Sequence, residues 1–284
     1  MHVATNQMRR DAAKRKLASQ QARRAQQAAR RRRIAVISSA AVVVVVLVAV
    51  VLLSTIGRGG DDAPASAAPS DAANASTAAA QPAATGPGTC AYPSDGNAAK
   101  QNTPPSTEGV SNEGDASVAL ATSAGPIGLT LNRAEAPCTV NSFVSLAGQG
   151  YFDGTSCHRL TTGEGLKVLQ CGDPTGTGTG GPGYTIPDEA PTTLAPSPSG
   201  GGTVTYPRGT LAMAKTAQPN SGGSQFFLVY ADSTLPPDYT VFGTIDEAGL
   251  ATIDKVAAAG TDDSNGTGDG KPKTPIEIQT VTVS

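Results

Sequence analysis

The sequence from about residue 115 to residue 284 predicts a mainly β fold, a closed eight-stranded antiparallel β-barrel capped by two α-helices. Three observations lead to this fold class. Short runs of β-branched, aromatic and other apolar residues recur along this region, separated by Gly, Pro, Asn and Asp. Only two stretches carry apolar residues at the three-to-four-residue spacing of a helix. Many short strands with so few helices are typical of a barrel whose ends the helices cover.

The predicted strands are 117–121, 127–131, 155–160, 166–172, 208–214, 225–230, 240–245 and 275–283. The first two form a hairpin across residues 124–126, because Ile127, Leu129 and Leu131 alternate toward one face. The strand at 225–230 holds two adjacent phenylalanines, Phe226 and Phe227, whose rings must point to opposite sides of the sheet. One side belongs to the core, and the other is able to line a pocket.

The two predicted helices differ in their signals. The first begins at Pro137, a residue that the first helical turn tolerates, and ends near residues 148–150. Its apolar stripe consists of Val140, Phe143, Val144 and Leu146. The second helix covers 247–258 and places Leu250, Ile253 and Val256 on one face.

The N-terminal part predicts a membrane anchor. Residues 1–33 form a basic leader, in which the stretch from residue 9 to 33 has eleven Lys and Arg against one acid, Asp11. Residues 34–56 carry no charge over 23 residues, enough to cross a hydrocarbon core of about 30 Å at ~1.5 Å per residue. A single-pass transmembrane signal anchor is therefore expected, with the lipid bilayer as a partner. A cleaved signal peptide is the alternative, but its apolar region spans only roughly 7 to 15 residues.

The charge distribution also predicts the location. By the positive-inside rule the leader stays in the cytoplasm, and the C-terminal domain lies outside the cell membrane. Because the leader's charges are explained as a topology signal, no nucleic-acid partner is expected. Residues 57–114 are rich in Ala, Pro, Ser and Thr, which predicts a disordered stalk. The segment Cys90-Ala91-Tyr92-Pro93 is expected to dock onto the domain, because a cysteine in a disordered stalk is otherwise hard to explain.

Four cysteines are present: Cys90, Cys138, Cys157 and Cys171. Outside the cytoplasm an even number favours disulfides, and three connectivities are possible. Pairing of Cys157 with Cys171, on neighbouring strands, and of Cys90 with Cys138 is favoured. A metal site is not expected, because the sequence has no CxxC pair and His158 is the only histidine beyond the N-terminal tail.

Six motifs in the folded part carry a family resemblance. They are His158-Arg159, Leu169-Gln170-Cys171-Gly172-Asp173, Gly178-Thr179-Gly180-Gly181, Arg208-Gly209-Thr210-Leu211-Ala212-Met213-Ala214, Gly223-Ser224-Gln225-Phe226-Phe227 and Val241-Phe242-Gly243. Their order and spacing resemble those of the cyclophilins over the whole domain, 115–284. With the leader, span and stalk, the chain resembles the membrane-anchored cyclophilin-type prolyl isomerases of actinobacteria.

The resemblance implies a peptidyl-prolyl cis-trans isomerase that acts on Xaa-Pro bonds of exported or cell-envelope proteins and needs no cofactor. It implies that Arg159 is the catalytic arginine and that Gln170 orients it. It also implies a substrate site made of Phe227, Met213, Val168, Leu235, Gln225, Ala214, Lys215, Tyr239 and His158.

Several positions depart from the family pattern. The link between Arg159 and Gln170 is longer than usual, and Lys167 stands where an aromatic residue is common. Lys215 replaces an asparagine, and Tyr239 replaces a histidine. Thr234 stands where many cyclophilins have a tryptophan that contacts cyclosporin, so weak cyclosporin binding is expected.

Two other classes of function remain as alternatives. A thiol enzyme using Cys157 or Cys171 with His158 is disfavoured, because Cys157 and His158 are neighbours on a strand and point to opposite faces. A non-catalytic module that binds proline-containing peptides at the membrane is the stronger alternative.

Overall fold

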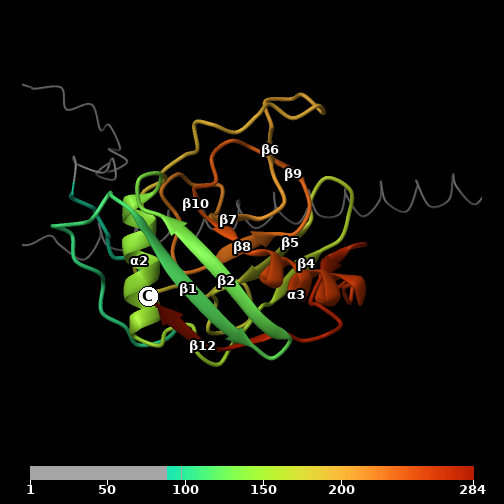
Figure 1. The fold of residues 1–284 in the computed structure, drawn as a ribbon, viewed down its shortest axis with the longest axis horizontal. Coiled ribbons are helices and arrows are strands. Elements are labelled where there is room, and N and C mark those ends of the chain that lie inside the picture. Colours follow the sequence, from blue (N-terminus) through green and yellow to red (C-terminus); the bar gives the residue numbers. More distant parts are fainter. Residues whose placement is uncertain (1–87, 97) are drawn as a thin grey trace, which may run out of the picture. The chain divides into compact units, whose positions relative to one another are not determined.

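The computed structural model describes residues 88–284 except residue 97 (Figure 1). The predicted leader, the predicted membrane span at 34–56 and the first part of the predicted stalk lie outside the described residues. Within the described part, every helix is too short or too polar to cross a bilayer.

One curled sheet of ten strands forms the body of the domain, in the order β11-β4-β5-β8-β7-β10-β2-β1-β12-β3, and all its neighbours are antiparallel. Its strands are β1 (Asp115–Thr122), β2 (Gly125–Asn132), β3 (Thr155–Ser156), β4 (Arg159–Thr161), β5 (Val168–Cys171), β7 (Thr210–Met213), β8 (Phe226–Val229), β10 (Val241–Ile245), β11 (Asp269–Gly270) and β12 (Glu277–Val283). A separate pair joins β6 (Val204–Tyr206) to β9 (Ser233–Leu235).

The prediction of a closed, eight-stranded barrel is wrong in two respects. The sheet has ten strands, and its two end strands, β11 and β3, are not paired with each other in the described residues. The predicted strand at 155–160 breaks at His158, where the chain changes partners. Before the break it pairs with β12, and the amide of Cys157 still donates to Ile276 O at 3.0 Å. After the break it pairs with β5 and β11.

Both predicted helices are confirmed, as α2 (Pro137–Gly148) and α3 (Glu247–Ala258). Helix α3 has a local cap, because the Asp246 side chain accepts a hydrogen bond from Gly249 N at 2.7 Å. Helix α2 has no such local cap, because its N-cap residue, Ala136, makes no side-chain hydrogen bond to the helix. Instead, the carboxylate of Glu189, some fifty residues away, accepts hydrogen bonds from Cys138 N and Thr139 N, each 2.9 Å long.

The core has two parts, on opposite faces of the central strands. The larger part contains the stacked and edge-to-face rings of Phe143, Phe152 and Phe226. The smaller part consists of Val168, Tyr206, Ala212, Phe227 and Val229. As the alternation on β8 predicts, the two adjacent phenylalanines are divided between them.

Residues 88–96 and 98–114 are folded against the domain, where the sequence predicted docking of Cys90-Ala91-Tyr92-Pro93 but otherwise the end of a disordered stalk. Cys90 and Val110 are both buried, and backbone hydrogen bonds join Cys90 N to Thr107 O and Val110 N to Gly88 O. The composition is misleading here because a disulfide and backbone hydrogen bonds, and few large apolar side chains, hold this segment.

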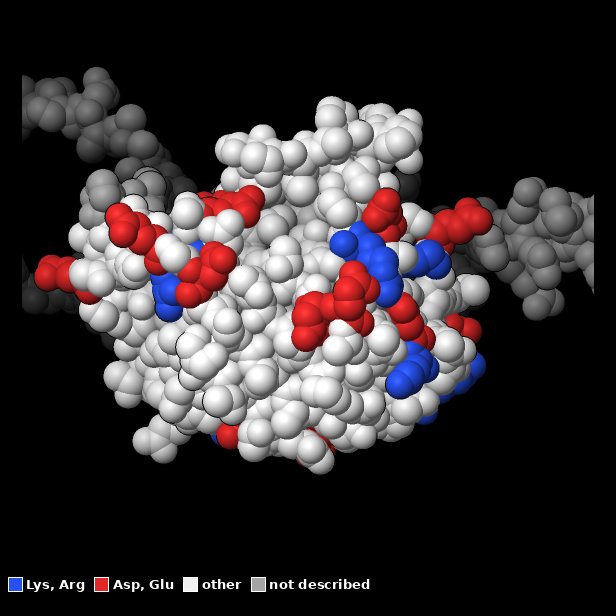
Figure 2. Space-filling view, in the orientation of Figure 1, with Lys and Arg blue, Asp and Glu red and all other residues white. Residues whose placement is uncertain are grey.

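Charged side chains of both signs lie close together on the face drawn in Figure 2 and border a largely uncharged surface. An exposed ion pair joins Arg208, in the link between β6 and β7, to Asp254 of α3 at 2.8 Å. Because the pair is exposed, its contribution to stability is small.

Candidate functional site

Three neighbouring strands bring the predicted catalytic and pocket residues into one row. In the sheet register Arg159 on β4 faces Gln170 on β5, and Gln170 faces Phe227 on β8. Phe227 in turn faces Ala212 on β7. Side chains directly opposite one another on antiparallel strands share a face. Residues far apart in the sequence are therefore neighbours on the outer face of the sheet.

This row borders a cavity of about 240 Å³, called here the first cavity. It is lined by Arg159, Leu166, Val168, Gln170, Ala214, Lys215, Phe227, Leu235 and Tyr239. Its floor is the ring of Phe227, which meets the ring of Tyr239 edge to face at 5.6 Å between centroids. An apolar floor with the guanidinium of Arg159 at the rim suits a ligand that is apolar and has a hydrogen-bond acceptor at its edge.

The segment that carries Tyr239 is fixed from beneath. The hydroxyl of Tyr206 shares its single proton between the carbonyl oxygens of Pro236 and Tyr239, at 3.0 and 3.2 Å, and accepts a hydrogen bond from Tyr239 N. Burial raises the pKa of the Tyr206 hydroxyl to about 12, so it stays protonated and able to donate. The first cavity thus has a preformed wall.

Arg159 is held by two side chains. Its Nε and one terminal nitrogen donate to the two carboxylate oxygens of Asp269 at 2.8 and 2.7 Å. The other terminal nitrogen donates to Gln170 Oε1 at 3.3 Å. The hydrogen bonding of Arg159 to Asp269 raises the pKa of Arg159 and lowers the pKa of the Asp269 carboxyl. The guanidinium is consequently charged and fixed in orientation.

Asp269 is a site residue that no sequence motif predicts. It lies on β11, next to β4, but 110 residues from Arg159 along the chain, in a loop of Gly, Asp, Ser, Asn and Thr that is typical of a turn. No local pattern separates it from the other acids there. Leu166 also lines the first cavity without having been predicted, while the neighbouring Lys167 does not line it and donates from Nζ to Thr162 O.

The amide of Gln170 continues the chain of contacts. Its Nε2 donates to Gln225 Oε1 at 2.9 Å, and Gln225 Nε2 donates to the carbonyls of Gly178 and Gly180 at 3.0 and 2.9 Å. These bonds fix both amides, so that the oxygen of Gln170 faces Arg159. Gln225 does not line the first cavity but borders a second cavity beside it.

Lys215 lies between the two cavities with its charge satisfied. Its Nζ is 2.7 Å from Asp188 Oδ2 and 3.2 Å from Asp238 Oδ2, and its side chain is only 6% exposed. Burial alone lowers the pKa of this amine, but the bonds to the two carboxylates outweigh burial, and the pKa is raised. Lys215 thereby joins three loops at the rim of the site.

Two predicted site residues lie elsewhere. The expectation that Met213 lines the pocket is wrong, because strand alternation turns it into the larger core, while Ala212 and Ala214 face the other side. His158 does not line the first cavity either. Its ring lies beside the loop at Gly178, and its Nδ1 is buried without a partner among the described residues. Burial lowers the pKa of His158, which favours a neutral ring.

Thr234 lies on β9 next to the cavity residue Leu235, but it does not line the cavity itself. Its amide donates to Gly165 O, and its hydroxyl contacts that of Ser197. Both favoured disulfides, Cys90–Cys138 and Cys157–Cys171, are present in the structure. The second one closes the end of the β4–β5 ladder that carries Arg159 and Gln170.

Comparison with known proteins is consistent with this geometry. A family model described as cyclophilin type peptidyl-prolyl cis-trans isomerase matches residues 117–283. The chain is 55% identical over 196 residues to a Mycobacterium leprae protein named "Probable peptidyl-prolyl cis-trans isomerase B", a match that covers 68% of this chain and 65% of the relative.

Two further relatives bear similar names. A Mycobacterium tuberculosis protein, also named "Probable peptidyl-prolyl cis-trans isomerase B", is 59% identical over 167 residues, with 58% of this chain and 53% of the relative covered. A Helicobacter pylori protein named "Peptidyl-prolyl cis-trans isomerase" is 40% identical over 139 residues, with 48% of this chain and 77% of the relative covered. The chain spans under two thirds of the length of the two mycobacterial proteins. Since the family model covers more than half of the chain, the chain belongs to the family of cyclophilin-type peptidyl-prolyl cis-trans isomerases.

Proposed function

We propose that this protein is a peptidyl-prolyl cis-trans isomerase that accelerates rotation about Xaa-Pro bonds. The observation that carries the proposal is the placement of Arg159. Its guanidinium is held by Asp269 and Gln170 at the rim of a cavity whose floor is Phe227.

The chemistry needs no nucleophile and no cofactor. Amide resonance gives peptide-bond rotation a barrier of about 18–20 kcal/mol, so an Xaa-Pro bond exchanges over tens to hundreds of seconds. When the bond twists, the lone pair of the prolyl nitrogen is no longer delocalised and becomes a hydrogen-bond acceptor. A donor that meets this nitrogen only in the twisted state lowers the barrier.

Arg159 has N–H groups that remain available to donate to the prolyl nitrogen. A guanidinium carries five N–H groups, and the bonds to Asp269 and Gln170 use three of them. Two N–H groups remain for a ligand. In the proposal the proline ring rests against Phe227, Val168 and Leu235, and one remaining N–H of Arg159 donates to the prolyl nitrogen. Because Arg159 is oriented in advance, little reorganisation is needed during rotation.

The proposed substrates are proline-containing segments of exported or cell-envelope proteins. The proposal places the C-terminal domain outside the cytoplasm and the protein in the cell membrane, anchored through residues 34–56 with the basic leader inside. Two disulfides in the described part support an oxidising location. Protease treatment of intact cells tests it, because an external domain is digested while the leader is protected.

Exchange spectroscopy on an Ala-Pro peptide tests the activity, with the full-length protein beside Arg159→Ala. Wild type is expected to accelerate cis/trans exchange, and the variant is expected to return it to the uncatalysed rate with peptide binding retained. If wild type shifts the peptide resonances and leaves exchange uncatalysed, the alternative of a non-catalytic proline-peptide binding module is correct.

A further inference from the structure

A second cavity, of about 450 Å³, adjoins the first. Gln170, Ala214 and Lys215 line both of them. The walls of the second cavity are residues 178–185 on one side and 221–225 on the other. A polypeptide whose proline occupies the first cavity therefore brings a nearby residue to the second.

The wall at 178–185 is rich in glycine, and such a loop needs outside support to keep one shape. On its inner side Gln225 donates to two of its carbonyls. At its base the buried carboxylate of Asp173 accepts from Thr177 N at 3.1 Å and Gly178 N at 2.6 Å. Burial raises the pKa of Asp173, but hydrogen bonds from the side chain and amide of Thr175 and from the amides of Gly180 and Gly178 outweigh burial and lower the pKa, so the carboxylate stays charged.

On its outer side the wall is braced by residues 88–96 and 98–104, together called here the strap. Asp95 N donates to Gly183 O at 2.9 Å and Ala99 N to Gly181 O at 2.8 Å. Thr185 N donates to Pro93 O at 2.9 Å, and Asn102 Nδ2 donates to Pro182 O at 3.0 Å. The strap thus forms an outer layer of the second cavity, and Asp95 lines it.

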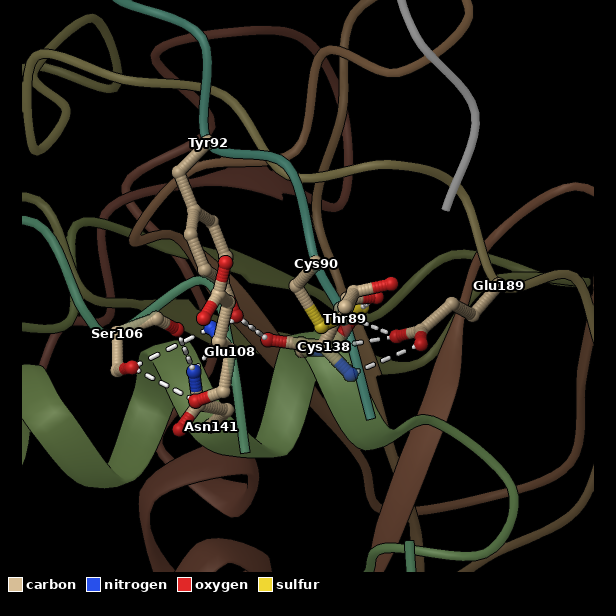
Figure 3. The surroundings of a disulfide bond; sticks show 9 residues. Thr89, Cys90, Tyr92, Ser106, Glu108, Cys138, Asn141 and Glu189 are labelled. Carbon is tan, nitrogen blue, oxygen red and sulfur yellow. Dashed lines mark hydrogen bonds between the residues drawn. A yellow bond between two sulfur atoms is a disulfide. The ribbon is translucent and has the colours of Figure 1, made fainter. Parts of the chain in front are cut away.

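The strap is fastened at both ends of α2. At the start of the helix Cys90 is bonded to Cys138, and the Tyr92 hydroxyl donates to Cys138 O at 2.8 Å (Figure 3). Just beyond the end of the helix Lys100 Nζ donates to the carbonyls of Gly150 and Asp153 at 2.7 and 2.9 Å. A segment fixed at these two points holds Asp95 beside the wall.

The charged residues that line the second cavity favour a cationic ligand. Its charged lining residues are Asp95 and Lys215. The ammonium of Lys215 is already held by Asp188 and Asp238. Asp95 is exposed, and no cation of the described part of the chain pairs with it. A cationic side chain entering this cavity gains a partner, while an anionic one meets like charge.

We propose that Asp95, held in place by the strap, makes the second cavity select a Lys or Arg side chain close to the Xaa-Pro bond, with the Asp95 carboxylate as its counter-charge. The inference rests on the proposed function for the position of the proline. It extends that function, because it assigns a choice among proline-containing segments to a part of the chain outside the sheet.

A peptide series tests the subsite with the full-length protein. Each peptide contains one Ala-Pro dipeptide. Lys, Glu or Ala is placed in turn at each of the three positions before this dipeptide and the three positions after it. Wild type is expected to bind the Lys peptide about two to five times more tightly than the Glu peptide at one position, the range that an exposed ion pair supports. In Asp95→Asn this difference between the Lys and Glu peptides disappears.

The matched control is Glu108→Gln, which removes an exposed acid from the segment that follows the strap, away from both cavities. This variant is expected to discriminate Lys from Glu as wild type does. The subsite is refuted by equal binding of the Lys and Glu peptides to wild type at every position, or by discrimination that persists in Asp95→Asn. Binding is read from peptide resonance shifts, so the test remains decisive if exchange is not catalysed, an outcome that contradicts the isomerase proposal alone.

Discussion

Both carboxylate oxygens of Asp269 accept hydrogen bonds from the guanidinium of Arg159, at 2.8 and 2.7 Å. Asp269 lies on β11, the strand next to the one that carries Arg159. A bidentate pair of this kind fixes the plane of the guanidinium as well as its position. Asp269 is thus a positioning residue, which acts through Arg159 and does not line the first cavity.

Replacing Asp269 by Asn is expected to lower kcat for Xaa-Pro isomerisation about tenfold, or ~1.4 kcal/mol, and to leave KM nearly unchanged. The reason is that the apolar floor still binds the proline while Arg159 loses its fixed orientation. In an Arg159→Ala background the same change is expected to have no further effect. Glu164→Gln, which removes an exposed acid from the β4–β5 loop, serves as control. Additive losses in the double variant contradict the positioning role.

The pH profile of activity follows from the same pair. Because the hydrogen bond with Arg159 lowers the pKa of Asp269, this carboxylate stays charged below the usual Asp value of about 4. The pair's stabilisation is complete above that value and is lost as the pH falls through the lowered pKa. Exchange rates measured from pH 7 down to pH 3 are expected to hold until below about pH 4 in wild type. Asp269→Asn is expected to lack this acid limb, and an identical limb in both proteins refutes the assignment.

Substitutions at Met213 and Leu235 separate the core from the pocket. Met213→Ala leaves a cavity in the larger core and is expected to cost about 2–5 kcal/mol of unfolding free energy with KM unchanged. Leu235→Ala removes part of the first cavity's wall and is expected to raise KM with a smaller loss of stability. Urea unfolding and isomerase kinetics on both variants check this. A raised KM for stable, folded Met213→Leu contradicts the core position.

Removing the Cys90–Cys138 disulfide is expected to lower stability by about 4 kcal/mol, since it closes a loop with a sequence separation of 48. The double variant Cys90→Ser with Cys138→Ser leaves the other disulfide in place. Urea unfolding measures the loss, and exchange of a short Ala-Pro peptide is expected to stay at the wild-type rate. A large fall in that rate indicates that the first cavity depends on the strap.

Cyclosporin is expected to bind weakly. The chain has no tryptophan, and Thr234, at the position where many family members have one, does not line the first cavity. Titration calorimetry is expected to give a dissociation constant in the micromolar range or weaker. A nanomolar constant refutes the prediction.

The sequence predicted the elements whose signals are local. Helix α3 was placed with its exact bounds because Leu250, Ile253 and Val256 repeat at helical spacing. The short strands β6, β9 and β11 were missed because two or three residues show no period. Of the two extra strands of the sheet, one is β11, and the other arises because the chain changes partners at His158, which no local pattern encodes.

At the site, motifs identified the strands but did not fix every orientation. Arg159, Gln170 and Phe227 come together as expected, because each lies within a motif on a central strand. Met213 was assigned to the wrong face, since a motif does not say which of two neighbours points outward. Asp269 was missed because its partner is distant in sequence.

The capping of α2 by Glu189 has a consequence for the order of folding. The first turn of this helix lacks a partner for its amides within its own stretch of sequence, and two of them are satisfied only by a carboxylate from residue 189. A chain that is synthesised from its N-terminus therefore exposes residues 137–148 well before their cap exists. We expect the helix to fluctuate during synthesis and to become stable only when the segment around Glu189 has emerged, so that these two regions consolidate together as one late step.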